Sequence, residues 1–215
     1  MTLSDSPLQL IAILFLLSLL PLAIVMGTSF LKLAVVFSIL RNALGIQQVP
    51  PNMALYGLAL ALSLFIMGPT GFAVYARWHP VESAGAPSLR ANWDSEALAP
   101  YRRFLQRNAE ESETRYFQNI ISKTWPEEIK RKIKPDSLLI LLPAFTVSQL
   151  TQAFRIGLLI YLPFIAIDLL VSNILLAMGM MMVSPMTISL PFKLLIFLLA
   201  GGWDLVLSQL MQSFS

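Results

Sequence analysis

The sequence predicts an all-α membrane protein, built from kinked apolar helical hairpins and a small polar helical domain, that assembles into a ring. Charge is confined to one region: 27 of the 215 residues are charged, and twenty of these lie within residues 77–136. The flanking segments are apolar over lengths that match or exceed the roughly 20 residues needed to cross a bilayer. Prolines interrupt these segments, which is tolerated only where protein or a water-filled cavity surrounds the break.

The N-terminal region, residues 1–76, is expected to contain apolar helices joined by a connecting loop. Residues 6–31 carry no charge, and because no basic residue precedes this run, we expect an uncleaved span rather than a signal peptide. Polar residues recur through residues 32–52, and two consecutive prolines near the end of this stretch stop a helix, which predicts the loop. A second apolar helix is expected over residues 53–76.

The central region, residues 77–136, is expected to be a small amphipathic helical domain. It begins with several helix breakers, including Pro80, and we expect this beginning to be irregular. Farther on, Pro100 suits the first turn of a helix, and Thr124 with Glu127 matches the pattern of a capping box. A domain of about 60 residues buries only a modest core, so we expect it to pack against neighbouring elements.

The C-terminal region, residues 137–215, carries only four charges and is expected to form apolar hairpins around a methionine-rich loop. Its first apolar runs are separated at Arg155 and at Asp168. Residues 183–185 predict a turn, and the glycine pair at 201–202 predicts a break in the last run. The whole chain then contains four hydrophobic elements, or six if this last region is divided into pieces.

Six prolines lie inside the apolar regions, and they bear on what surrounds the helices. An interior proline removes a helical hydrogen bond and costs about 3 kcal/mol in water. In a bilayer the freed carbonyl group needs a protein partner. Because this chain offers little protein of its own, we expect other subunits to cover these positions, which are Pro21, Pro69, Pro143, Pro163, Pro185 and Pro191.

The composition excludes several classes of function. The chain has no cysteine and one histidine, so thiol catalysis, disulfides and Cys/His metal sites are excluded. Basic residues are interleaved with acidic ones rather than gathered into a stripe, which argues against nucleic-acid binding. The sequence lacks the metalloprotease, nucleophile-elbow and P-loop motifs. We therefore expect no enzymatic activity, no cofactor and no metal.

The first candidate site is a methionine cluster. Half of the ten methionines lie within residues 178–186, at Met178, Met180, Met181, Met182 and Met186. Methionine is unbranched and adapts its shape to irregular surfaces. A ring of these side chains, one set per subunit, would form a soft apolar constriction that excludes ions yet deforms around a polypeptide. The alternative is ordinary packing within the membrane, where methionine commonly fills gaps.

Charged residues in apolar surroundings form the second candidate site. An unpaired charge at the centre of a membrane helix costs about 2.5–3.5 kcal/mol, so we expect Asp168 to pair with Lys193, within or between subunits. The alternative is that each side chain reaches a nearby membrane surface. Lys32 and Arg41 flank the predicted loop and are expected at the interface, and Arg155 is expected to be ionic or interfacial.

Two long segments carry a family resemblance. They are FSILRNALGIQQVPPNMALYGLALALSLFIM, residues 37–67, and LLPAFTVSQLTQAFRIGLLIYLPFIAIDLLVSNILLAMGMMMVSPMTISLPFKLLIFLLAGGW, residues 141–203. Both closely resemble the FliP/SctR family, which are core export-apparatus proteins of bacterial flagella and of virulence-associated type III secretion systems. The resemblance covers nearly the whole chain except the central region. The string GIQQVPPN is similar to the virulence branch of the family.

The resemblance implies a set of further expectations. It implies a pentameric ring, completed by SctS/FliQ-type and SctT/FliR-type membrane proteins and other export-apparatus components, in the inner membrane of a Gram-negative bacterium. It implies a gasket at Met180, Met181 and Met182, with Met178 beside them, and ionic contacts between helices at Asp168 and Lys193. The central region would correspond to a periplasmic domain. Secreted proteins would pass through the ring unfolded.

The function expected on these grounds is a pore-forming core subunit of a type III protein export gate. A small secondary transporter or ion channel, working as its own oligomer and dependent on Asp168, is the main alternative. A proton relay through Asp168 and Asp204 is less favoured, because coupled transporters usually carry more intramembrane acids or paired internal repeats. A scaffold that only assembles its partners is the third possibility.

Overall fold

Helices make up nearly all of the chain that the structure describes. The computed structural model describes residues 7–46, 50–82, 96–131 and 133–214, and within these ranges it contains no strand, so the all-α fold class is confirmed. In chain order the helices are α1 (Pro7–Gly27), α2 (Phe30–Leu44), α3 (Asn52–Glu82), the 3-10 turn η1 (Glu96–Leu98), α4 (Ala99–Asn108), α5 (Glu111–Thr124), α6 (Glu127–Lys130), α7 (Leu138–Ala177), α8 (Pro185–Leu199) and α9 (Gly202–Gln212).

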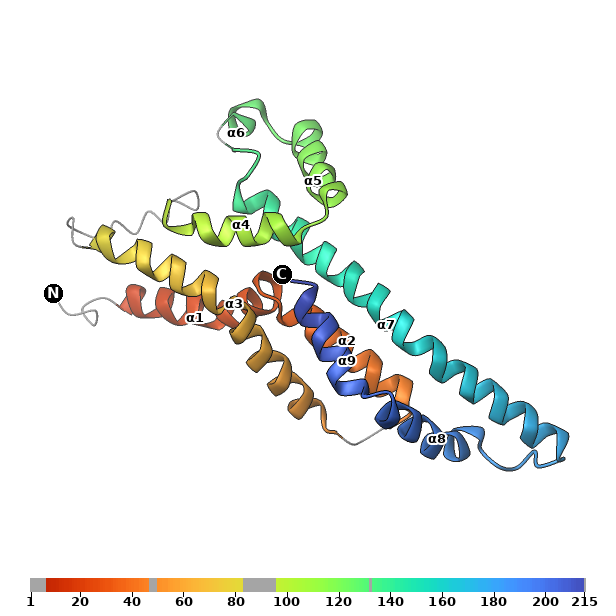
Figure 1. The fold of residues 1–215 in the computed structure, drawn as a ribbon. Coiled ribbons are helices and arrows are strands. Elements are labelled where there is room, and N and C mark those ends of the chain that lie inside the picture. The colour runs from red at the N-terminus through yellow and green to blue at the C-terminus, as the bar shows by residue number, and fades with distance from the viewer. Residues whose placement is uncertain (1–6, 47–49, 83–95, 132, 215) are drawn as a thin grey trace.

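The helices form an elongated arrangement around α2 and α7. Figure 1 shows α1 and α3 at one end of the molecule, while the second half of α7 extends toward the other end. The polar helices α4, α5 and α6 gather beside the beginning of α7. Helices α8 and α9 fold back along the bundle, so the C-terminus lies near the middle of the molecule.

Among the residues that the structure describes, three helices are long and apolar enough to cross a membrane. The stretches are Leu10–Gly27 in α1, Asn52–Arg77 in α3 and Leu138–Ala177 in α7, and the pair α8 and α9, bent by 61°, would make a fourth span. Within the subunit only 6%, 11% and 17% of the three stretches are buried. Most of their apolar surface is therefore left for lipid or other protein to cover.

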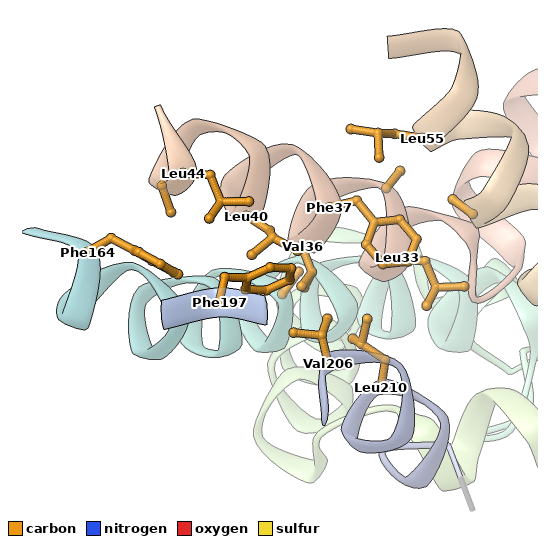
Figure 2. Close-up of a cluster of buried hydrophobic side chains, with 14 residues drawn as sticks. Leu33, Val36, Phe37, Leu40, Leu44, Leu55, Phe164, Phe197, Val206 and Leu210 are labelled. Carbon is orange, nitrogen blue, oxygen red and sulfur yellow. The ribbon is translucent and has the colours of Figure 1, made fainter. Parts of the chain in front are cut away.

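Helix α2 occupies the centre of the main hydrophobic core, although the sequence predicts a loop here. Its two charged residues suggest a surface segment, but the apolar residues between and beside them form one helical stripe. Figure 2 shows this stripe meeting side chains from α3, α7, α8 and α9. The predicted loop is therefore wrong over most of its length, and the buried stripe consists of Leu33, Val36, Phe37, Leu40 and Leu44.

Helix α7 runs unbroken for 40 residues, although the sequence predicts separate runs. It passes through Pro143 and Pro163 without ending. A proline removes one hydrogen bond, and packing against α2, α4, α5 and α8 holds the remaining turns in place. At about 1.5 Å per residue the helix is about 60 Å long, roughly twice the hydrocarbon thickness of a bilayer. One straight crossing cannot account for its whole length.

The polar helices pack against the first half of α7. Leu105 of α4 is fully buried in a second, smaller cluster with Leu138, Leu141 and Phe145 of α7. Pro100 lies in the first turn of α4, as predicted. Helix α5 is amphipathic but has no buried side chain. The central region therefore depends on α7 for its core, as expected for its size.

Two local predictions for the central region are wrong. Helix α3 continues through Pro80 to Glu82, so the first residues of the central region are helical rather than irregular. Residues 83–95, which the prediction of an irregular beginning also covered, lie outside the described ranges. The capping box of Thr124 and Glu127 does not form, because Thr124 ends α5 and Pro126 is the N-cap of α6. A connection this short places Glu127 at the first helical position, too early for the third-position role in a capping box.

Two buried polar residues of α7 hold the junction between α4 and α5. The Ser148 hydroxyl accepts a hydrogen bond from the backbone N–H of Glu110 at 2.8 Å, and Gln149 Nε2 donates to the carbonyl oxygen of Asn108 at 2.9 Å. Both side chains are fully buried. Gln149 thereby satisfies a carbonyl group at the end of α4, and Ser148 satisfies the backbone N–H of Glu110, the N-cap residue of α5.

Replacing Ser148 with alanine should loosen this junction. The substitution leaves the Glu110 amide unpaired, at a cost of about 1–3 kcal/mol, so the α4–α5 junction should open about tenfold more often. Limited proteolysis of the membrane-embedded protein would measure this as faster cleavage within residues 109–137. Ser122→Ala is the control, because the exposed Ser122 hydroxyl donates to the Asn119 carbonyl of its own helix. Equal cleavage of the two variants would contradict the prediction.

Candidate functional site

The methionine cluster occupies the turn between α7 and α8, and the backbone conformation of one glycine determines the shape of that turn. Helix α7 ends at Ala177 with Met178 as its C-cap, and Gly179 adopts the left-handed conformation with φ 73°. The N–H of Met180 donates to the Leu175 carbonyl at 2.9 Å, and the N–H of Gly179 donates to the Leu176 carbonyl at 3.0 Å. This pair of bonds is a Schellman motif, in which glycine is favoured because it has no Cβ. Helix α8 begins after Ser184, as the sequence predicts.

The methionine side chains of this turn project away from the subunit. Met178 is 67% exposed, Met181 80% and Met182 101%, while Met180 is 42% exposed. Three consecutive methionines cannot all share one face of a helix, and the structure places Met180, Met181 and Met182 in a turn instead. No other part of the described chain covers Met181 or Met182, so they are available to contact lipid, a second subunit or a passing ligand.

An apolar groove runs from the methionine turn along the space between α7 and α8. Its volume is about 540 Å³. Met178 and Met180 form part of its wall, so the turn and the groove make one continuous apolar surface. All lining residues are apolar: Ile167, Leu170, Val171, Ile174, Leu175, Met178, Met180, Ile188, Phe192 and Ile196.

The structure brings together the two residues expected to pair inside the apolar region. Lys193 Nζ of α8 lies 2.6 Å from Asp168 Oδ2 of α7. Lys193 is only 2% exposed, whereas the Asp168 side chain is 34% exposed. The pair is formed within one subunit and joins the two helices that flank the methionine turn. We call this contact, with the groups bonded to it, the α7–α8 clamp.

Two members of the clamp were not expected from the sequence. The Ser189 hydroxyl donates to Asp168 Oδ1 at 2.6 Å, and Lys193 Nζ also donates to the carbonyl oxygen of Ala43 in α2 at 3.1 Å. Ser189 precedes Lys193 by four residues, so it lies on the same face of α8, and this spacing is a signal that could have found it. The Ala43 contact joins segments 150 residues apart, and sequence spacing carries no signal for it.

Lys32 is buried rather than interfacial. It is 0% exposed, and its Nζ lies 3.2 Å from the Ser213 hydroxyl and 3.8 Å from the centre of the Phe214 ring. Burial lowers the pKa of Lys32 to about 8, because an apolar environment disfavours the charged form. Lys32 lies in α2, which is not among the candidate spans, and it fastens the end of the chain to the core.

Arg41 and Arg155 lie outside the α7–α8 clamp. Arg41 Nη1 donates to Asn52 Oδ1 across the α2–α3 connection, and its Nε is buried without a partner among the described residues. Arg155 is exposed on α7, which suits an interfacial position. Over the described ranges no group of three or more His, Cys, Asp or Glu side chains could hold a metal ion.

These features define a multi-pass helical membrane protein with a paired charge inside its apolar region and an exposed methionine turn. Residues 13–210 match the FliP family. The chain belongs to the FliP family, and the resemblance to FliP/SctR proteins is confirmed.

The similar proteins are components of type III secretion systems. The chain is 83% identical to the virulence protein YscR of Salmonella typhimurium over 215 residues, covering 100% of both chains. It is 59% identical to the Yop proteins translocation protein R of Yersinia pestis over 197 residues, covering 91% of this chain and 90% of the relative. It is 46% identical to the harpin secretion protein HrpW of Pseudomonas syringae pv. syringae, covering 92% and 96%. By their names, these relatives are a virulence protein, a translocation protein and a secretion protein.

Proposed function

We propose that this protein is a pore-forming subunit of a type III export gate, and that its methionine turn seals the pore. Copies of the chain assemble in a pentameric ring in the inner membrane of a Gram-negative bacterium, with SctS/FliQ-type and SctT/FliR-type proteins and other export components. Residues 77–136 form its periplasmic part. Met180, Met181 and Met182, with Met178 beside them, close the channel when it is idle and yield when an unfolded substrate passes.

One observation carries the proposal: the chain belongs to a secretion family and exposes its methionines at a turn instead of packing them. Met182 is 101% exposed and Met181 80%. Flexible thioether side chains conform to surfaces of varied shape, which suits a seal that meets many different polypeptides. An apolar constriction also opposes ion flow by losing water when it narrows.

The main alternative, a small transporter or ion channel, has less support. Such a protein needs a titratable group free to bind its coupling ion. Here the Asp168 carboxylate, on which this alternative depends, is held by Lys193 and Ser189. The scaffold alternative predicts that substitutions in the turn have no effect on permeability, and the same experiment tests it.

Replacing Met180, Met181 and Met182 together with alanine should open the seal. Each substitution removes most of a long side chain, so the constriction widens and ion leak across the membrane should rise about tenfold or more, because pore dewetting depends steeply on radius. Ion leak is measured in cells that express the complete secretion system without substrate.

The matched variants use leucine and a distant methionine. Leucine at the same three positions keeps apolar bulk, so the idle seal should hold while secretion slows. Met53→Ala changes an exposed methionine at the beginning of α3, and leak should stay at the wild-type level. If the triple-alanine variant assembles and its ion leak equals that of the wild type, the methionine turn does not seal the pore.

A further inference from the structure

Lys193 lies where three helices meet, and its contacts extend beyond an ion pair. Its stem belongs to α8, its Nζ contacts Asp168 of α7 at 2.6 Å, and the same Nζ contacts the carbonyl oxygen of Ala43 in α2 at 3.1 Å. The side chain is 2% exposed, so solvent cannot replace either partner. Both contacts are therefore needed to accommodate the ammonium group in this apolar region.

The carbonyl end of α2 has its own requirement for a donor. The last four carbonyl groups of a helix lack helical partners, and that end carries partial negative charge. Helix α2 ends at Leu44, and Gly45 turns the chain away in the left-handed conformation, with φ 76°. The Gly45 N–H bonds to the Asn42 carbonyl at 3.1 Å, which leaves the Ala43 carbonyl to Lys193. Lys193 is thus a side-chain cap supplied by a distant segment.

Ser189 fixes the other oxygen of Asp168. It is 0% exposed, and its hydroxyl lies 2.6 Å from Asp168 Oδ1 and 3.2 Å from the Met186 carbonyl. Since a hydroxyl donates one hydrogen, the shorter distance assigns the bond to the carboxylate. With one oxygen held by Ser189 and the other by Lys193, the carboxylate has a single orientation.

We infer that Lys193 and Ser189 are positioning residues for the methionine turn, and that Lys193 acts by capping α2 as well as by pairing with Asp168. The clamp holds α7 and α8, the two helices that flank the turn, in a fixed position relative to each other. The contact with α2 joins both helices to the most buried part of the molecule. The turn at 178–184 can then yield to a substrate while its supporting helices stay in place. The sealing role of the turn rests on the proposed function, whereas the cap on α2 does not.

Hydrogen–deuterium exchange of the assembled complex separates a cap from a simple ion pair. Lys193→Met removes both contacts, so amides in the last turn of α2 and the following residues, 43–46, should exchange about tenfold faster, the effect of losing a charge-assisted hydrogen bond. Asp168→Asn keeps Lys193 available to Ala43, so exchange should rise in α7 and α8 but stay near wild type at residues 43–46. Equal effects of the two variants at residues 43–46 would overturn the cap.

Ion leak tests the positioning role in variants that assemble normally. Ser189→Ala leaves every methionine in place, yet the idle leak should rise several-fold because the Asp168 carboxylate loses its fixed orientation. Ser189→Thr keeps the hydroxyl and should restore the seal. If the Ser189→Ala variant is as abundant as the wild type and its ion leak is unchanged, Ser189 contributes to packing alone, and its assignment as a positioning residue is overturned.

The two proposals fail in different ways. If the triple-alanine variant of the turn does not leak, the seal is wrong, while the exchange pattern at residues 43–46 still decides the cap. If the triple-alanine variant leaks and Ser189→Ala does not, the seal stands and the positioning role is wrong. If Lys193→Met fails to assemble, Lys193→Leu replaces it, and because leucine also has no donor for the Ala43 carbonyl, residues 43–46 should again exchange faster than in Asp168→Asn.

Discussion

Asp168→Ala should be among the most destabilising single substitutions in this protein, and more harmful than Lys193→Met. Removing the carboxylate leaves the Lys193 ammonium, which is 2% exposed, without a counter-charge. Breaking a buried ion pair by removing one partner costs about 3–5 kcal/mol, and we expect the lower end because Asp168 is 34% exposed. Lys193→Met instead leaves a carboxylate that water can still reach, so its cost should be smaller.

Thermal unfolding of the detergent-purified protein measures this difference. For a chain of this size about 3 kcal/mol corresponds to a fall in Tm of about 6–12 °C. The double variant Asp168→Ala with Lys193→Met should be more stable than Asp168→Ala alone, because no charge is then left buried. Asp168→Asn is the control that keeps the size of the side chain and an acceptor for Ser189. A larger loss for Lys193→Met than for Asp168→Ala would contradict the argument.

Gly202→Ala should disrupt the bend between α8 and α9. A Cβ at this position would lie 2.2, 2.3 and 2.7 Å from three atoms of the Phe197 ring. The ring is rigid and buried, with contacts to Phe164 and Trp203, so it cannot move aside without opening the main core. Overpacking of this kind costs about 1–3 kcal/mol and sometimes more, and here the displaced ring belongs to the core around α2.

The same substitution in α3 provides the control. Nothing lies within 4 Å of a Cβ built at Gly68 or Gly71, both inside the helix. Alanine there should be neutral or stabilise the helix by up to about 1 kcal/mol. Tm and tryptophan fluorescence, to which Trp203 beside Phe197 contributes as one of four tryptophans, should change for Gly202→Ala and not for Gly68→Ala. A Gly202→Ala variant as stable as wild type would contradict the packing argument.

Elements whose signal is local could be predicted from the sequence. The apolar length of α1 and α3, the turn at Ser184 and the break before Gly202 all follow from side chains that are neighbours in the chain. The pairing of Asp168 with Lys193 could also be predicted, because two opposite charges in an apolar region have few other ways to be accommodated. The methionine turn was predicted as a candidate site, and its sealing role remains a proposal.

Elements whose state depends on distant neighbours could not be predicted in this way. Helix α2 resembles a connecting loop in sequence because it contains Lys32 and Arg41. Lys32 is nevertheless buried, against the Ser213 hydroxyl and the Phe214 ring from the far end of the described chain. Helix α7 passes through two prolines because other helices support it along its length.

By itself, the sequence determined that this protein is helical and apolar, with a turn at Ser184 and a break before Gly202, and it favoured an ion pair between Asp168 and Lys193. Only the tertiary structure decided that α2 is the core and that Lys193 joins Asp168 to the end of α2. The physical reason is that helix formation depends on residues three and four apart, whereas the cost of burying a charge depends on which groups surround it. In this fold those groups come from segments up to 181 residues apart.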